Sequence, residues 1–212
     1  MALRVNLGCG STPTPGWLNF DNSFTVRVAA NPLLRPIARA LLLRANREFV
    51  ELAARGDIRF GRASRIPLAD GSVEVLYSSH MLEHLDPDDG RKFLAEARRV
   101  LRPGGVLRIV VPDLRKLAEA YIERGDADAF VAQTYMAVDR PRGLKASLRR
   151  LLFGFRDHRW MYDGPSLAKL LRENGFQNVV VLRAGETGIE GSGPLDLRER
   201  EDESVYAEGH AP

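Results

Sequence analysis

"RVNLGCGSTPTPGWLNFD", residues 4–21, has the pattern of a strand, a glycine turn and a second strand. The second strand ends in an acidic residue. The apolar run breaks at Gly8-Cys9-Gly10, where two glycines let the backbone turn sharply with no side chain above it. Leu18-Asn19-Phe20 predicts a short strand that ends at Asp21. A carboxylate at the tip of the neighbouring strand is where ribose hydroxyls are held, so the spacing suits an adenosine.

The composition favours one domain without covalent or metal crosslinks. A chain of 212 residues can bury roughly 70 % of its unfolded surface in a single core. The single Cys9 excludes a disulfide framework, and without partner thiols or Cys/His spacing a zinc site is not expected. Met1 leads almost directly into a predicted strand and no run approaches 18 apolar residues, so we expect a soluble, cytoplasmic protein.

A basic segment that a minimal sheet does not need follows Asp21. Apolar residues at helical spacing predict an amphipathic helix, which Pro32 and Pro36 confine to the residues after them. This helix either packs over the sheet edge or serves as a lid or interfacial helix that contacts anionic head groups. Its apolar stripe is Leu34, Ile37, Ala38, Leu41 and Leu42.

Strands and helices alternate through the rest of the chain, which predicts a parallel sheet with helices on both faces. Strands are expected at 57–60, 73–78, 106–111 and 179–182, and a final antiparallel strand at 203–208. Helices are expected from Asp86 to Pro103-Gly104-Gly105, from Asp113 to Gly125, and from Gly164 to Gly175. The region 126–162 is expected to be irregular and to cover the site. The helix after Asp113 is expected to bury Leu114, Leu117, Ala118, Tyr121 and Ile122.

Polar residues follow the predicted strand 73–78 at the carboxyl edge of the sheet, where open α/β sheets bind their ligands. They are Ser79, His80, Glu83 and His84.

These motifs, in this order, resemble the class I S-adenosylmethionine-dependent methyltransferases. The resemblance is carried by the glycine turn and by the stretches 66–72, 78–84, 99–105 and 167–176. In detail the chain is similar to small bacterial members with a G-C-G…G-W-x-N-x-D pattern. The resemblance implies a doubly wound, Rossmann-like seven-stranded α/β sheet in the order 3-2-1-4-5-7-6, with strand 7 antiparallel. It implies one methyltransferase domain over residues 1–212, with basic helical insertions at about 22–56 and 126–162.

The resemblance also implies S-adenosyl-L-methionine as the cofactor. The glycine turn, Gly8, Cys9 and Gly10, would face its methionine part and ribose, and Asp21 would hold the ribose hydroxyls. In the family an Asp that accepts from the adenine amino group stands where this chain has Arg62. The backbone near Ala63 could still contact adenine, and Ser79 would lie beside the cofactor.

Methyl transfer from a sulfonium demands few catalytic side chains, and His80 is the best candidate base because its ordinary pKa suits proton abstraction near neutral pH. A scaffold role for His80 is the alternative. Glu83 and His84 either bind the acceptor or act structurally, and Asp113 is more easily read as a helix cap. His158 and Trp160, beside Arg156, Arg159 and Tyr162, form either an acceptor clamp or a solvated basic loop.

The expected activity is methyl transfer to an unidentified acceptor, an anionic small molecule or a saccharide or lipid intermediate, with peripheral contact to a membrane surface. A non-catalytic S-adenosylmethionine-binding or regulatory protein is the alternative, since Arg62 departs from the family pattern. Pro13 and Pro15 argue against a nicotinamide-dependent oxidoreductase. Nucleic-acid or protein methylation is less favoured, because there is no motif for a flipped base and no appended recognition domain. The sequence leaves the oligomeric state open.

Overall fold

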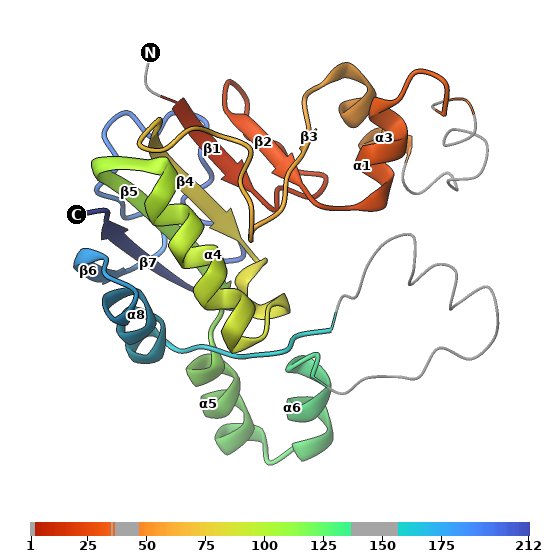
Figure 1. The fold of residues 1–212 in the computed structure, drawn as a ribbon. Helices are drawn as coiled ribbons and strands as arrows, with labels where there is room; N and C mark the ends of the chain where they lie inside the picture. Colours follow the sequence, from red (N-terminus) through yellow and green to blue (C-terminus); the bar gives the residue numbers. More distant parts are fainter. Residues whose placement is uncertain (1–2, 35, 37–46, 137–156) are drawn as a thin grey trace.

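A seven-stranded sheet in the order β3-β2-β1-β4-β5-β7-β6 organises the structure, a computed structural model that describes residues 3–34, 36, 47–136 and 157–212 (Figure 1). Strands β1 to β5 pair in parallel, whereas β7 is antiparallel to both β5 and β6. The predicted order and the antiparallel strand are therefore confirmed. The strands are β1 (Leu3–Leu7), β2 (Leu18–Asp21), β3 (Arg59–Phe60), β4 (Val73–Ser79), β5 (Leu101–Pro112), β6 (Gln177–Leu182) and β7 (Ser204–His210).

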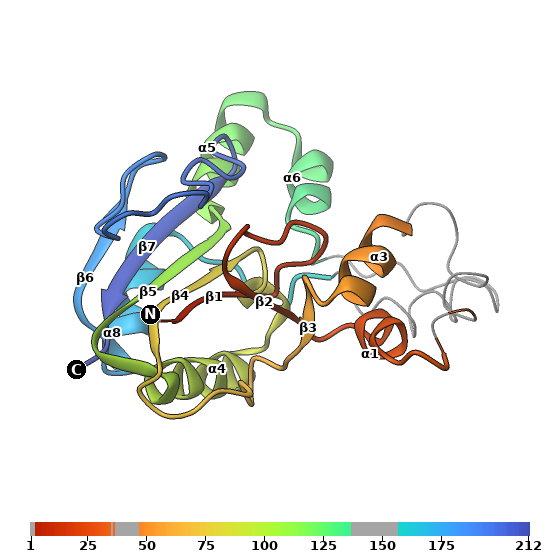
Figure 2. The ribbon, with the colours of Figure 1, turned by 90° about the horizontal axis from the view of Figure 1, so that it is seen from above.

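The helices lie around the sheet in separate groups. Helices α4 and α8 contribute to the main hydrophobic core on one face, α1 and α3 pack together beside β3, and α5 and α6 lie beyond β5 and β7 (Figures 1 and 2). Within the described residues, no helix combines the length and apolar character needed to cross a bilayer. The helices are α1 (Phe24–Ala30), α3 (Arg47–Arg55), the 3-10 helix η2 (Leu82–His84), α4 (Pro87–Val100), α5 (Leu114–Arg124), α6 (Ala127–Gln133) and α8 (Gly164–Glu173).

Helix α4 begins and buries its apolar stripe as its sequence predicts. The Asp86 carboxylate accepts a hydrogen bond from the backbone N–H of Asp89 at 2.9 Å, and Pro87 occupies the first turn, where no N–H is needed. Phe93, Leu94, Ala97 and Val100 are then fully buried against the sheet. The position of α4 is therefore fixed at both its cap and its packed face.

The opposite face of the sheet is covered near β5 and β7 by the loop between β6 and β7. Ile189 and Leu195 of this loop pack with Trp17, Tyr77 and Tyr206. Helices were expected on both faces of the sheet, but an irregular loop covers this part of the second face. Such a loop needs polar contacts to keep it in place.

A buried ion pair provides those contacts. The fully buried Arg108 of β5 donates to the Glu208 carboxylate of β7 at 2.6 Å and to the carbonyl oxygen of Glu186 at 2.9 Å. Glu208 in turn accepts from the hydroxyl of Thr187 at 2.6 Å and the backbone N–H of Gly188 at 2.8 Å. The pair joins two strands and anchors the covering loop.

Several sequence predictions need correction. Helix α1 lies in the first insertion that the resemblance described as helical, but the apolar pattern placed a helix only after Pro36; the Ser23 hydroxyl caps α1 by accepting from the N–H of Val26 at 3.4 Å. Residues 127–133 form α6, which Asp126 caps; their sequence pattern was read as irregular, whereas the resemblance placed them in a helical insertion. Most of the predicted basic helix lies outside the described residues, and its last part is α3.

Helix α5 also differs from its predicted packing. None of its residues is buried, Leu114, Leu117 and Ala118 are only half-buried, and Ile122 is 79 % exposed. The reason is its position, because α5 lies beyond the strand ends and contacts α6 instead of lying across the sheet (Figure 2). The Tyr121 ring meets the Phe130 ring of α6 at a centroid distance of 5.3 Å.

We predict that Glu208→Ala lowers the free energy of unfolding by roughly 3–5 kcal/mol, because it leaves Arg108 as a buried, unpaired charge. The matched control, Glu173→Ala, removes an exposed carboxylate that lies 3.7 Å from Lys169 and should cost at most about 1 kcal/mol. Urea denaturation measures both. Equal losses for the two variants would show that the buried pair does not anchor the loop.

Candidate functional site

The turn after β1 exposes main chain at one glycine and packs tightly at the other. Both Gly8, with φ of +77°, and Gly10, with φ of +52°, occupy backbone conformations that favour glycine. A Cβ atom at Gly8 would lie 2.7 Å from the Cγ atom of Met81, whereas one at Gly10 would have nothing within 4 Å. Gly8 therefore permits close packing against the end of β4, and Gly10 presents open main chain to a ligand.

Asp21 holds the rim of this turn from the end of β2. Its Oδ2 atom accepts from the N–H of Gly10 at 3.2 Å and its Oδ1 atom accepts from the N–H of Ser23 at 2.8 Å. Each carboxylate oxygen can accept more than one hydrogen bond, so both keep capacity for ribose hydroxyls. The open face of Gly10 and the half-buried carboxylate beside it fit the adenosine ligand that the sequence predicts.

The Cys9 side chain packs on the buried side of the turn. It is buried among residues of α1 and α3, including Val26 and Val50. Burial, and secondarily the nearby charge of Asp21, raises the pKa of the Cys9 thiol to about 12. Cys9 is therefore a neutral packing residue at neutral pH, and its backbone N–H donates to the carbonyl oxygen of Phe20 at 3.1 Å.

The expected adenine side opens into a pocket of about 680 Å³ after β3. Gly61 in its wall donates its N–H to the carbonyl oxygen of Asp21 at 3.1 Å, which connects the pocket to the cofactor turn. Arg62 is exposed, with its guanidinium carbon 5.8 Å from the centre of the Phe60 ring, and Ala63 is half-buried against the core. Arg62 thus places a cation over the Phe60 ring at the position where the family carries a carboxylate.

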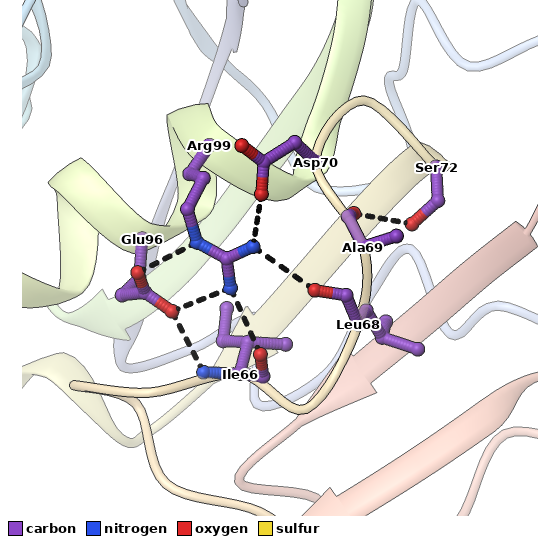
Figure 3. Close-up of polar contacts among 7 residues, drawn as sticks. All are labelled: Ile66, Leu68, Ala69, Asp70, Ser72, Glu96 and Arg99. Atoms are coloured by element: carbon purple, nitrogen blue, oxygen red, sulfur yellow. Dashed lines mark hydrogen bonds and ion pairs between the residues drawn. The ribbon is translucent and has the colours of Figure 1, made fainter.

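Arg99 of α4 holds the loop that lines this pocket (Figure 3). Its guanidinium donates to the carbonyl oxygens of Ile66 and Leu68 at 2.9 and 3.0 Å and to the Asp70 carboxylate at 2.5 Å. Glu96 pairs with Arg99 at 2.8 Å and accepts from the N–H of Ile66 at 2.9 Å. Hydrogen bonding to Arg99 lowers the pKa of Glu96. The loop is therefore fixed before any ligand arrives.

A second pocket, of about 460 Å³, lies between the loop 13–19 and residues 52–59. Neither pocket is lined by Gly8, Gly10 or His80. The glycine turn therefore lies outside both pockets, and the hydrogen bond between Gly61 and Asp21 connects it to the first.

His80 sits in a strained position directly after β4. Its φ of +47° is uncommon for a residue with a side chain, and such strain often marks functional sites. Its Nε2 atom is 2.9 Å from the hydroxyl of Ser204, at the start of β7. Its Nδ1 atom is 3.4 Å from both the Glu83 carboxylate and the guanidinium of Arg200. Both ring nitrogens thus have partners, and no sequence motif marked Ser204 or Arg200.

Three of the predicted acceptor residues converge beside His80. Glu83 is 1 % exposed, and the Nε2 atom of His158 lies 4.0 Å from its carboxylate. The rings of His84 and His158 meet edge to face with centroids 5.1 Å apart. Burial lowers the pKa of His158, with a smaller contribution from His84, while Glu83 opposes the shift. Sequence placed Glu83 and His84 together but did not show that His158 returns to them.

The backbone explains how His158 reaches this place. The N–H groups of Arg159 and Trp160 donate to the carbonyl oxygen of Glu83 at 2.7 and 3.2 Å. This segment is thereby fastened to η2, with the Trp160 side chain 47 % exposed at the rim.

Asp113 and Ser79 lie at the same edge of the sheet. Asp113 caps α5 by accepting from the N–H of Arg115 at 3.0 Å, and burial raises the pKa of its carboxyl. Ser79 ends β4 next to His80. The cap geometry agrees with the preferred sequence interpretation of Asp113. Arg156 lies outside the described residues.

The chain is similar to known proteins in both sequence and fold. Residues 5–109 match the family model described as a methyltransferase domain. A Mycolicibacterium smegmatis protein named "Probable S-adenosylmethionine-dependent methyltransferase" is 44 % identical over 59 residues, which are 28 % of this chain and 22 % of that protein. An uncharacterised 37.1 kDa protein from a transposon of Streptomyces fradiae is 36 % identical over 124 residues, 55 % of this chain and 32 % of that protein. The chain thus spans a third or less of the curated relatives it matches.

Solved structures share the fold across the whole chain. An S-adenosylmethionine-dependent methyltransferase from Thermotoga maritima, described as a possible histamine N-methyltransferase, has a TM-score of 0.55 at 18 % identity and covers 100 % of this chain and 83 % of its own. A methyltransferase from Methanosarcina mazei has a TM-score of 0.51 at 18 % identity, covering 99 % and 92 %. The match over residues 5–109 assigns a methyltransferase domain to this chain, and the strand order and these likenesses show the fold of the class I S-adenosylmethionine-dependent methyltransferases.

Proposed function

We propose that this protein transfers a methyl group from S-adenosylmethionine to a small acceptor held at the carboxyl edge of the sheet. The observation that carries the proposal is the open main chain at Gly10 beside the Asp21 carboxylate. His80, Glu83, His84 and His158 gather at the ends of β4 and η2, on the same edge. Methyl transfer requires a cofactor-binding site and a cluster of polar side chains on the same edge.

The residues of this chain would mainly bind, orient and accept a proton. When bound, S-adenosylmethionine supplies an already activated methyl group, so little further chemistry is asked of the protein. Main chain at Gly10 and the Asp21 carboxylate would hold the cofactor. The pocket beside Phe60, Arg62 and Ala63 would receive the adenine, with ring stacking in place of the family carboxylate. Orientation of the two reactants would then supply much of the rate enhancement.

His80 is our proposed proton acceptor. Its ring is fixed between Ser204 and Glu83, and the carboxylate of Glu83, 3.4 Å from Nδ1, would stabilise the imidazolium formed when the acceptor loses its proton. In this role the hydrogen bond with Ser204 would open or shift when the acceptor binds.

The acceptor that we propose is anionic. The segment 140–159 is rich in arginine, and its described end, Arg159, is exposed beside η2 and 3.6 Å from Asp86. Arginine binds carboxylate and phosphate in a bidentate geometry, and the exposed Trp160 could stack on a sugar. A saccharide or lipid intermediate with a phosphate or carboxylate group suits these side chains, and a basic surface would also favour contact with anionic lipid.

The cofactor position is tested by Gly10→Val, which should abolish S-adenosylmethionine binding because the new side chain would fill the space of the ligand. Gly16→Val is the matched control, since Gly16 also has a positive φ, of +77°, and nothing within 4 Å of a Cβ. Both variants should lose about 1–2 kcal/mol of stability to backbone strain. Calorimetry with the cofactor should detect binding to the Gly16 variant alone. Equal affinities for the two variants would contradict the assignment.

A general-base role predicts that His80→Asn lowers kcat by about 10²-fold while cofactor affinity stays nearly unchanged. His210→Asn provides the control, because His210 ends β7, whereas His80 meets Ser204 at the start of that strand. Turnover would be measured as S-adenosylhomocysteine formed with an acceptor found by metabolite screening. Full activity in the His80 variant would assign this residue to the scaffold.

An anionic acceptor predicts that charge reversal at Arg149, Arg150 and Arg156 raises the acceptor KM and leaves cofactor affinity unchanged. The same charge change at Lys169, Arg172 and Arg183 serves as the control, since these exposed residues lie on α8 and directly after β6. Raising the salt concentration should also raise KM, because exposed charges are screened over about 8 Å at physiological ionic strength. If KM changes neither with salt nor with charge reversal at Arg149, Arg150 and Arg156, the acceptor is neutral.

A further inference from the structure

Glu83 carries a buried carboxylate whose charge is poorly compensated. Its side chain is 1 % exposed, and within the described residues neither carboxylate oxygen accepts a hydrogen bond. Burying an ionised carboxylate without hydrogen bonds or a counter-charge is costly, so such groups are normally paired or bound to a metal. Two imidazoles lie close to its Oε1 atom, with the Nδ1 atom of His80 at 3.4 Å and the Nε2 atom of His158 at 4.0 Å.

Two of the neighbouring histidines offer nitrogen atoms to the same space. Ligand atoms of Glu83, His84 and His158 all lie within 4.8 Å of one another. Tetrahedral coordination with bonds of 2.0–2.1 Å needs ligand atoms about 3.3 Å apart. Small side-chain rotations would therefore bring one carboxylate oxygen and two imidazole nitrogens into bonding distance of a common ion.

The tautomer of His84 already suits metal binding. Its Nδ1 atom lies 3.1 Å from the carbonyl oxygen of Asp157, and because a carbonyl can only accept, this nitrogen carries the proton. The Nε2 atom is then unprotonated and available to a cation. A backbone carbonyl that orients the other nitrogen is the usual outer support of a metal-bound histidine.

We propose that Glu83, His84 and His158 form a binding site for one divalent transition-metal ion, for which Zn²⁺ is the probe. Two imidazoles and one carboxylate favour Zn²⁺, Fe²⁺ or Co²⁺, whereas Mg²⁺ and Ca²⁺ prefer sites made of oxygen atoms. Three protein ligands leave a tetrahedral ion with one position for water or an acceptor oxygen. The ion also supplies the positive charge that the buried carboxylate lacks.

The location gives the ion a role that rests on the proposed function. Met81 packs at Gly8 and lies directly before η2, so Glu83 and His84 follow a residue that contacts the cofactor turn. An acceptor oxygen bound to the ion would be positioned beside the methyl donor, and the ion would lower the pKa of its hydroxyl. Ion binding itself does not depend on methyl transfer and can be measured without an acceptor.

The test is titration of the chelator-treated full chain with Zn²⁺ alone, by calorimetry, with Co²⁺ absorption as a spectroscopic readout. We expect one equivalent of Zn²⁺ to bind and Mg²⁺ to bind far more weakly. Glu83→Gln keeps the shape of the side chain and removes its charge, and His158→Asn removes one nitrogen ligand. Each should weaken Zn²⁺ binding by at least about 10–100-fold, the range for loss of an outer support alone, and reduce the visible Co²⁺ bands. The control His210→Asn should bind as the unaltered chain does.

Circular dichroism and S-adenosylmethionine calorimetry separate this proposal from the cofactor assignment. Should Glu83→Gln fail to fold, His84→Asn and His158→Asn decide the matter. The proposal is overturned if the unaltered chain binds no stoichiometric Zn²⁺, or if the ligand variants bind it as tightly as the His210 variant. In either case S-adenosylmethionine binding would be unaffected, and the cofactor assignment would stand.

Discussion

The close approach of three strand ends at Gly8 is the constraint on which the site depends. The N–H groups of Gly8 and Cys9 both donate to the carbonyl oxygen of Phe20, at 2.8 and 3.1 Å, so the end of β1 is tied to β2. On the other side, Gly8 leaves no room for a Cβ atom beside Met81, which follows β4. The same packing leaves Gly10 uncovered and places Met81, the residue before η2, against Gly8.

Two buried carboxylates, one within the sheet and one at its carboxyl edge, are compensated differently. Behind the site, Arg108 and Glu208 are buried as a direct pair with several further hydrogen bonds, which favours a rigid structural role. At the carboxyl edge, Glu83 is equally buried but faces imidazoles at longer distances. Arg108 and Glu208 therefore anchor the fold, whereas Glu83 and the imidazoles around it remain available for chemistry.

Local sequence patterns predicted the sheet because they are strong there: a glycine turn, nearly continuous apolar strands and the Asp86-Pro87 helix start. The antiparallel strand and its order came from the family resemblance. The packing of α5 was wrong because periodicity locates an apolar stripe but not the surface it meets. The gathering of His158 with Glu83, and of Ser204 with His80, depends on contacts between distant parts of the chain that no local pattern records.

We infer that the main chain at Gly10 and the carboxylate of Asp21 form the cofactor-binding site. A crystal structure of the full chain with S-adenosylhomocysteine is the decisive test. We expect ribose hydroxyls within hydrogen-bonding distance of Asp21, the homocysteine part over residues 8–10, and adenine in the pocket beside Phe60 and Arg62. Density for the ligand elsewhere, with the glycine turn uncovered, would contradict it.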